Sequence, residues 1–180
     1  LVDESADLAL AARRIVFGKF LNCGQTCVAP DYILVERSVK DEFLVYLKKW
    51  IVRMYGADAT ENDAYVKMIN QKHFDRVTGL IDPKKVVFGG GRNERTMQIQ
   101  PTILDDVTAE DAVMQEEIFG PIFPILPVDS MAEAEEFIRK REKPLALYLF
   151  TQNKALAERF LRYVPFGGGC VNDTTIAGVK

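Results

Sequence analysis

The sequence is poor in the residues that build metal centres and disulfide frameworks. Its 180 residues include one histidine and three cysteines. A zinc ion needs about four nitrogen, sulfur or oxygen ligands. The pair Cys23 and Cys27 has no second pair to complete such a set, since His73 and Cys170 are single residues far along the chain. An odd number of cysteines also argues against a disulfide framework. We therefore expect no metal site and reduced thiols, as in a cytoplasmic protein.

Long apolar runs and an excess of positive charge are absent as well. No run approaches the roughly 18 apolar residues of a membrane-spanning helix. The formal net charge is −3, so no basic field would attract nucleic acid or an anionic membrane surface. Hydrophobic residues make up 48% of the chain, enough to fill the core of one domain. We expect one domain with neither a membrane span nor a nucleic-acid partner.

Apolar residues recur at two different periods along the chain. Helical spacing predicts helices over 8–20, about 38–55, 71–81, 130–141 and 153–163, and the N-terminal caps are expected at Ser5 or Asp3, at Ser38 and at Ser130. Short apolar runs predict strands at 32–35, 86–88, 102–104, 122–128, 145–150 and 170–171, and Leu1-Val2 is compatible with the tail of another strand. Because Pro124 and Pro127 interrupt the run 122–128, we expect an edge or bent strand there. The alternation is typical of an α/β fold with a layered, largely parallel sheet flanked by helices.

The segment FLNCGQTCVAPD, residues 20–31, places two cysteines just after the first predicted helix. Backbone N–H groups at such a junction favour the thiolate, the reactive form of cysteine. Gly24 permits backbone geometry that a side chain would obstruct. Cys27 is therefore a candidate nucleophile. A redox pair with Cys23 would normally have two intervening residues rather than three, and burial without reactivity is the ordinary fate of a free cysteine. The spacing alone leaves the nucleophile and the inert cysteine as alternatives.

The segment MQEEIFGPI, residues 114–122, combines two carboxylates with an aromatic residue and a Gly-Pro turn. It is compatible with an exposed helix end. It is equally compatible with a carboxylate, Glu117, and an aromatic ring, Phe119, that are presented to a ligand. No glycine-rich stretch of the sequence has the G-x-G-x-x-G or G-x-x-x-x-G-K-[ST] spacing of a phosphate-binding loop. These residues alone do not decide between the two interpretations.

Taken together, the two segments resemble the signatures of the aldehyde dehydrogenase superfamily. Phe20-x-x-x-Gly24-Gln25-x-Cys27-x-Ala29 is similar to its cysteine active-site signature, and Glu117-Ile118-Phe119-Gly120-Pro121 to its second hallmark, in the family's order and at about its separation. Matching stretches also occur at 101–104, 143–148 and 168–173, so the resemblance covers nearly the whole chain. Residues 28–32 are most similar to the class 3 branch, which acts on medium- and long-chain or aromatic aldehydes.

The resemblance implies an oxidoreductase that converts small-molecule aldehydes into carboxylic acids with NAD or NADP. It implies that the Cys27 thiolate attacks the aldehyde to form a thiohemiacetal, that hydride passes to nicotinamide, and that water then hydrolyses a thioester. It also implies that Glu117 hydrogen-bonds the nicotinamide ribose, that Phe119 packs near the nicotinamide, and that Cys23 is a bystander. The full-length enzyme would be a homodimer.

Parts of the family's machinery have no match in this sequence. The general-base glutamate of a Glu-Leu-Gly-Gly-Lys segment, the oxyanion-hole asparagine and the cofactor-binding domain precede the matching region in the family. We therefore expect residues 1–180 to be the catalytic domain of a longer enzyme, with the cofactor-binding domain upstream, and to be inactive alone. The alternative is a truncated, non-catalytic module of the same family that folds or oligomerises. Residues that would distinguish NAD from NADP lie outside the sequence.

Overall fold

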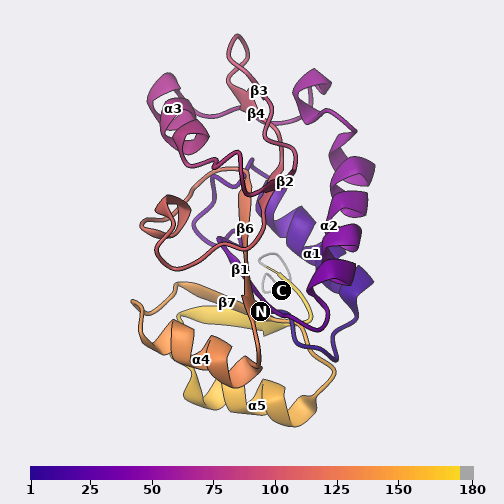
Figure 1. Ribbon diagram of the computed structural model, residues 1–180, viewed down its shortest axis with the longest axis vertical. Helices are drawn as coiled ribbons and strands as arrows, with labels where there is room; N and C mark the ends of the chain where they lie inside the picture. The colour runs from indigo at the N-terminus through magenta and orange to yellow at the C-terminus, as the bar shows by residue number, and fades with distance from the viewer. Residues whose placement is uncertain (175–180) are drawn as a thin grey trace.

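Strands and helices alternate along the chain, as the apolar periodicity predicts. A computed structural model describes residues 1–174 (Figure 1). In this described part the helices are α1 (Leu8–Phe20), α2 (Lys40–Tyr55), α3 (Gln71–Gly79), α4 (Met131–Arg139) and α5 (Lys154–Tyr163), with short 3-10 turns η1 (Ala59–Glu61) and η2 (Ala112–Met114). The strands are β1 (Ile33–Glu36), β2 (Val86–Phe88), β3 (Arg92–Asn93), β4 (Gln98–Ile99), β5 (Thr102–Leu104), β6 (Ile122–Val128), β7 (Ala146–Leu149) and β8 (Gly168–Val171). Every predicted helix and strand is present, with ends shifted by a few residues, while the β3–β4 hairpin is an addition.

The sheet is largely parallel, which confirms the predicted fold class. Its main part has the strand order β1-β6-β5-β2, in which only β2 runs antiparallel to its neighbour. Strands β7 and β8 form a separate parallel pair. Val2 joins the two groups, because it forms parallel bridges to Val35 in β1 and to Phe150, the residue directly after β7. The first residues of the chain thus lie between two strands, as the apolar pair at positions 1 and 2 indicated.

Of the two alternatives that its prolines predicted, an edge strand or a bent strand, β6 is not an edge strand. It lies between β1 and β5 and is buried over most of its length. Its two halves have different neighbours: residues 122–124 pair with β5, and residues 125–128 pair with β1. Each half is therefore paired along one side, so Pro124 and Pro127, which lack a backbone N–H, are tolerated in a strand between two others.

Alternating residues of the strands supply two hydrophobic cores, one on each face of the sheet. Ile33 and Phe123 belong to the core that α1 and α2 cover, whereas Leu34 and Ile122 belong to the core on the other side. Burial on both faces is the usual state of a parallel sheet. Figure 1 shows α1 and α2 side by side, with α3 and the β3–β4 hairpin towards one end of the molecule and α4 and α5 at the other.

The predicted helix caps are correct in part. Ser130 accepts a hydrogen bond from the Glu133 N–H (3.2 Å) and caps α4, as predicted. Helix α1 is capped instead by Asp7, whose carboxylate accepts from the Leu10 N–H (3.0 Å), because the Asp3 carboxylate is engaged by Ser5 and Thr151. Helix α2 has Val39 at its cap position and no side-chain cap, so Ser38 does not have the predicted role.

The two signature segments meet through their backbones. After α1 the chain turns with positive φ at Cys23 (55°) and Gly24 (74°). A Cβ atom added to Gly24 would lie 2.2 Å from the carbonyl oxygen of Gly120, in the turn before β6. The glycine is therefore needed for two reasons, its left-handed φ and this close approach. The contact places the segment that carries Cys27 against the segment that carries Glu117.

We expect Gly24→Ala to destabilise the chain strongly. The new methyl group adds the strain of a positive φ, about 1–3 kcal/mol, and also forces the Gly120 carbonyl to move. Gly79→Ala is the matched control, because no atom outside its own helix lies within 4 Å of the added Cβ. Urea unfolding should show a clear loss for the first variant and a change within about 1 kcal/mol for the second. Equal midpoints for the two variants would contradict the described contact.

Candidate active site

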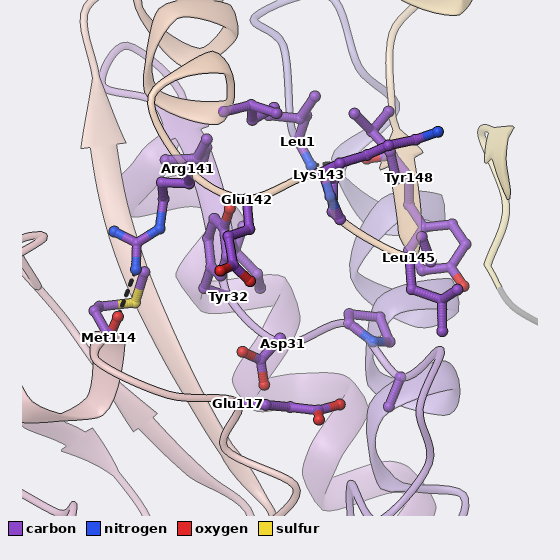
Figure 2. A pocket seen from close by; sticks show the side chains of 18 of the residues that line it. Leu1, Asp31, Tyr32, Met114, Glu117, Arg141, Glu142, Lys143, Leu145 and Tyr148 are labelled. Carbon is purple, nitrogen blue, oxygen red and sulfur yellow. Dashed lines mark hydrogen bonds between the residues drawn. The ribbon is translucent and has the colours of Figure 1, made fainter. Parts of the chain in front are cut away.

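A cavity of about 740 Å³ opens beside the cysteine segment. Cys27 and the residues up to Leu34 form one side of it, Met114 to Glu117 form another, and the loop before β7 closes it together with Leu1. Figure 2 shows Asp31 and Glu117 next to each other where these two sides of the cavity meet, with Leu145 and Tyr148 to their right in the view. The structure therefore brings Cys27 and Glu117, which are 90 positions apart in the sequence, to one cavity.

The three cysteines differ sharply in accessibility. Cys27 is exposed, Cys170 is half-buried and Cys23 is completely buried. The Cys23 thiol donates a hydrogen bond to the Tyr65 hydroxyl (3.4 Å), and burial raises its pKa to about 11. Burial also raises the pKa of Cys170. Cys27 is thus the thiol that an incoming electrophile can reach, while Cys23 is a packed core residue.

Hydrogen bonds fix the backbone on both sides of Cys27. The Gln25 side chain donates to the Lys67 carbonyl (3.1 Å) and accepts from the Ile69 N–H (2.9 Å), so it ties the turn to the loop before α3. After the cysteine, the Tyr148 hydroxyl donates to the Val28 carbonyl (2.7 Å). These contacts give a physical role to the glutamine of the first signature segment, which holds the turn by hydrogen bonds.

Glu117 and Phe119 lie in an irregular segment rather than at a helix end. Ile118 between them is completely buried, whereas Glu117 and Phe119 themselves are exposed. Phe119 adopts a positive φ of 49° and is 37% exposed. Glu117 lines the cavity, whereas Phe119 is absent from the residues that line it. The geometry therefore agrees with a carboxylate that is presented to a ligand, and it places Phe119 beside the cavity rather than inside it.

Two charged residues that the sequence patterns do not single out, Asp31 and Lys19, lie near Glu117: Asp31 beside it at the cavity and Lys19 buried against Asp31. The Lys19 side chain is only 1% exposed, and its Nζ lies 3.4 Å from the Asp31 carbonyl oxygen and 3.9 Å from Asp31 Oδ1. Burial lowers the pKa of Lys19 to about 8, against the opposing effect of the Asp31 charge. Partial burial, followed by the Asp31 charge, raises the pKa of Glu117. The sequence signal that could have identified Lys19 as a buried residue is its position on the apolar face of α1, four residues after Ile15.

Neither a metal centre nor a membrane span emerges from the described residues. Within 1–174, no three His, Cys, Asp or Glu side chains are grouped so that they could hold a metal ion. His73 lies on α3, where its N–H donates to the side chain of the Asn70 cap (3.0 Å). No helix in the same part of the chain combines the length and the hydropathy that crossing a membrane requires.

The chain belongs to the aldehyde dehydrogenase family, whose sequence profile matches residues 1–180. It is 49% identical over 175 residues to the "Aldehyde dehydrogenase, dimeric NADP-preferring" of Mus musculus, with 97% of this chain and 39% of the relative covered. It is 46% identical over 172 residues to the "Aldehyde dehydrogenase family 3 member A2" of Pongo abelii, with 96% and 36% covered. The solved structure "Substrate bound state of Staphylococcus Aureus AldH" has a TM-score of 0.96 and 47% identity, with 98% of this chain and 39% of that chain covered.

These similarities confirm the resemblance to the superfamily and to its class 3 branch. The chain spans less than two fifths of the length of these relatives. The part that is similar includes both signature segments, since nearly the whole of this chain is covered in each comparison.

The buried Lys19 predicts a specific pH dependence of stability. Its pKa falls from an ordinary value of 10.5 to about 8 on folding, so the unfolded chain binds more protons between these two pH values. The penalty for burying the ammonium is therefore full below pH 8 and disappears as the pH rises towards 10.5. We expect Lys19→Met to stabilise the chain at pH 7, by at most about 3 kcal/mol, and to lose this advantage at high pH.

Urea unfolding of both chains at pH 7 and at pH 9.5 measures this difference. Lys49→Met, on the exposed side of α2, is the matched control and should show no such pH-dependent gain. The prediction is wrong if Lys19→Met has the same advantage at both pH values, because a penalty that does not titrate cannot come from the ammonium charge. A variant less stable than the parent at pH 7 would likewise show that Lys19 stabilises the fold through Asp31.

Proposed function

We propose that this chain is the catalytic, cysteine-bearing domain of an NAD(P)-dependent aldehyde dehydrogenase. The observation that carries the proposal is the convergence of an exposed Cys27 and an exposed Glu117 on one cavity, within two segments that match the family's signatures. Family membership supplies the reaction class. The full-length protein would oxidise medium- and long-chain or aromatic aldehydes to carboxylic acids in the cytoplasm, as a homodimer.

The nucleophile of this reaction is the Cys27 thiolate. Its sulfur forms a bond with the carbonyl carbon of the aldehyde, and the electron pair of the broken π bond moves to oxygen to give a thiohemiacetal anion. The backbone N–H of Cys27 is one donor for this oxyanion. The turn that Gln25 and Gly24 hold in place keeps the sulfur at the cavity wall, so the entropy of orienting it is lost on folding rather than during the reaction.

Glu117 and Phe119 are the residues of this chain that would hold the nicotinamide end of the cofactor. The Glu117 carboxylate faces the cavity and can accept hydrogen bonds from two ribose hydroxyls, and the exposed Phe119 ring offers an apolar surface beside it. When bound, NAD or NADP accepts the hydride that leaves the carbonyl carbon. The roles of both residues are positional. The base that activates the hydrolytic water and most cofactor contacts would come from residues outside these 180, so we expect the 180 residues alone not to turn over aldehyde.

Thiol reactivity distinguishes an accessible Cys27 from an inert one. We expect a maleimide to modify Cys27 first, Cys170 more slowly and Cys23 last, because only Cys27 is exposed and the pKa values of the other two thiols are raised. Peptide mass spectrometry after timed labelling at pH 7 measures the order. Modification of all three at one rate would mean that the described burial of Cys23 does not hold in solution.

The decisive test uses the full-length parent enzyme with a panel of aldehydes and with NAD and NADP. We expect Cys27→Ser to lower kcat by about 10³-fold or more, as is typical for loss of a nucleophile that acts with partners. Cys170→Ser, which changes a thiol on β8, is the matched control and should keep its activity. Aldehyde oxidation that survives Cys27→Ser would overturn the proposal. NAD(P)-dependent turnover by the purified 180-residue chain would contradict only the expectation that these residues are inactive alone.

A further inference from the structure

The segment that carries Glu117 has no regular structure of its own. It lies between the end of η2 at Met114 and the start of β6 at Ile122, and residues 115–121 belong to no helix or strand. Its backbone polar groups must therefore find partners elsewhere, since a half-buried peptide group without one is unfavourable. Where these partners lie decides where the Glu117 carboxylate points.

One partner comes from the cysteine segment. Asp31 Oδ1 accepts a hydrogen bond from the Ile118 N–H at 3.1 Å. Asp31 is four residues after Cys27 and lies beside Glu117 on the cavity wall (Figure 2). The contact therefore joins the residue after Glu117 to the stretch of chain that follows the nucleophile.

The second partner is Arg76 on α3. Its Nη2 donates to the Ile118 carbonyl at 2.6 Å, and its Nη1 donates to the Glu117 carbonyl at 3.4 Å and to Glu116 Oε1 at 3.2 Å. The Arg76 side chain is 25% exposed, so these contacts are partly shielded from water and stronger than surface ion pairs. The planar guanidinium reaches these three oxygens through two separate nitrogens held in a fixed fork.

Helix α3 is itself fixed against the same segment. A Cβ atom on Gly120 would lie 2.6 Å from Val77 Cγ1, so the residue next to Arg76 packs directly on the Gly120 backbone. Arg76 and Asp31 thus hold the two peptide groups around Ile118 from two different elements, one through carbonyl oxygens and one through an N–H. Neither residue belongs to the two signature segments of this sequence, residues 20–29 and 117–121, although Asp31 lies two residues after the first.

We propose that Arg76 and Asp31 are positioning residues for Glu117: they hold its backbone so that the carboxylate faces the cavity where the nicotinamide ribose binds. The inference rests on the proposed function. Both residues act through the backbone of the Glu117 segment, Arg76 at its carbonyl oxygens and Asp31 at the Ile118 N–H. Their loss should therefore weaken cofactor binding much more than it slows the chemical step at Cys27.

The test measures NAD(P)H binding by fluorescence and steady-state kinetics in the full-length parent enzyme. Arg76→Met should raise the Kd and the KM for the cofactor about 10-fold, as expected if the Glu117 carboxylate loses one charge-assisted hydrogen bond to the ribose. It should change kcat by less than about 3-fold. The rate of Cys27 alkylation should stay unchanged. Arg37→Met is the matched control, because it also removes one arginine–carboxylate pair, with Asp129, but at an exposed position away from the cavity.

A double variant separates positioning from general stabilisation. If Arg76 acts through Glu117, then Arg76→Met should add little to the effect of Glu117→Gln on the cofactor Kd, because the interaction it supports is already lost. Full additivity of the two effects would overturn the proposal. An unchanged cofactor Kd in Arg76→Met would overturn it too. If Arg76→Met does not fold, then Arg76→Lys, which keeps the charge but not the fork of donors, replaces it, and the same criteria apply.

These outcomes are distinct from failure of the proposed function. A parent enzyme that binds no NAD(P)H, or that oxidises aldehydes after Cys27→Ser, would overturn both inferences together. A parent that binds the cofactor and depends on Cys27 while Arg76→Met behaves like Arg37→Met would overturn the positioning role alone.

Discussion

Two peptide backbones approach each other at Gly24 and Gly120 more closely than any side chain would permit. The turn after α1 and the turn before β6 are fixed relative to each other by this approach, and each turn carries a functional candidate a few residues away. Cys27 and Glu117 reach the same cavity because their segments share this contact rather than because they pair with each other. The approach explains the glycine at position 24, whereas an added Cβ at position 120 would meet the Val77 side chain on α3.

Charge is distributed unevenly around the contact. Lys19 is buried behind Asp31, Arg76 approaches from α3, and the carboxylates of Asp31 and Glu117 face the cavity. Lys19 and Arg76 therefore contact the segments that carry these two carboxylates, while further positive groups, Arg141 and Lys143 among them, line the same cavity. Such an arrangement favours the charged form of Glu117, since Lys19 and Arg76 each oppose the rise in its pKa that partial burial and the Asp31 charge cause.

The periodicity of apolar residues was sufficient to place the helices and strands, because the burial of one helix face or of alternate strand residues is a local property of the sequence. The position of β6 could not be predicted in the same way. Whether a proline is tolerated depends on which neighbour each half of the strand pairs with, and this is decided by residues elsewhere in the chain. The predicted cap of α1, Ser5 or Asp3, was also wrong. The helix begins at Leu8 with Asp7 as its cap, and the Asp3 carboxylate is engaged by Thr151, which lies 148 residues away.

The residues of the candidate site can be divided in the same way, into those that local sequence predicts and those that depend on distant partners. Cys27, Glu117 and Phe119 could be predicted because they stand in short, contiguous motifs. Arg76 could not, because its partners are 40 to 42 residues away and an arginine on a polar helix face gives no signal of its own. Lys19 differs again: its place on an apolar face marks it as buried, but only the folded chain shows that Asp31 is its partner.

Val2 links the main sheet to the β7–β8 pair through single bridges on either side. The backbone nitrogen of Leu1 donates to the Tyr148 carbonyl (2.8 Å), and the Tyr148 hydroxyl in turn donates to the carbonyl of Val28, next to Cys27. A chain of hydrogen bonds therefore runs from the seam between the two sheets to the backbone beside Cys27. A displacement of β7 relative to β1 would change this chain, so the alignment of the two sheets bears on the position of the proposed nucleophile.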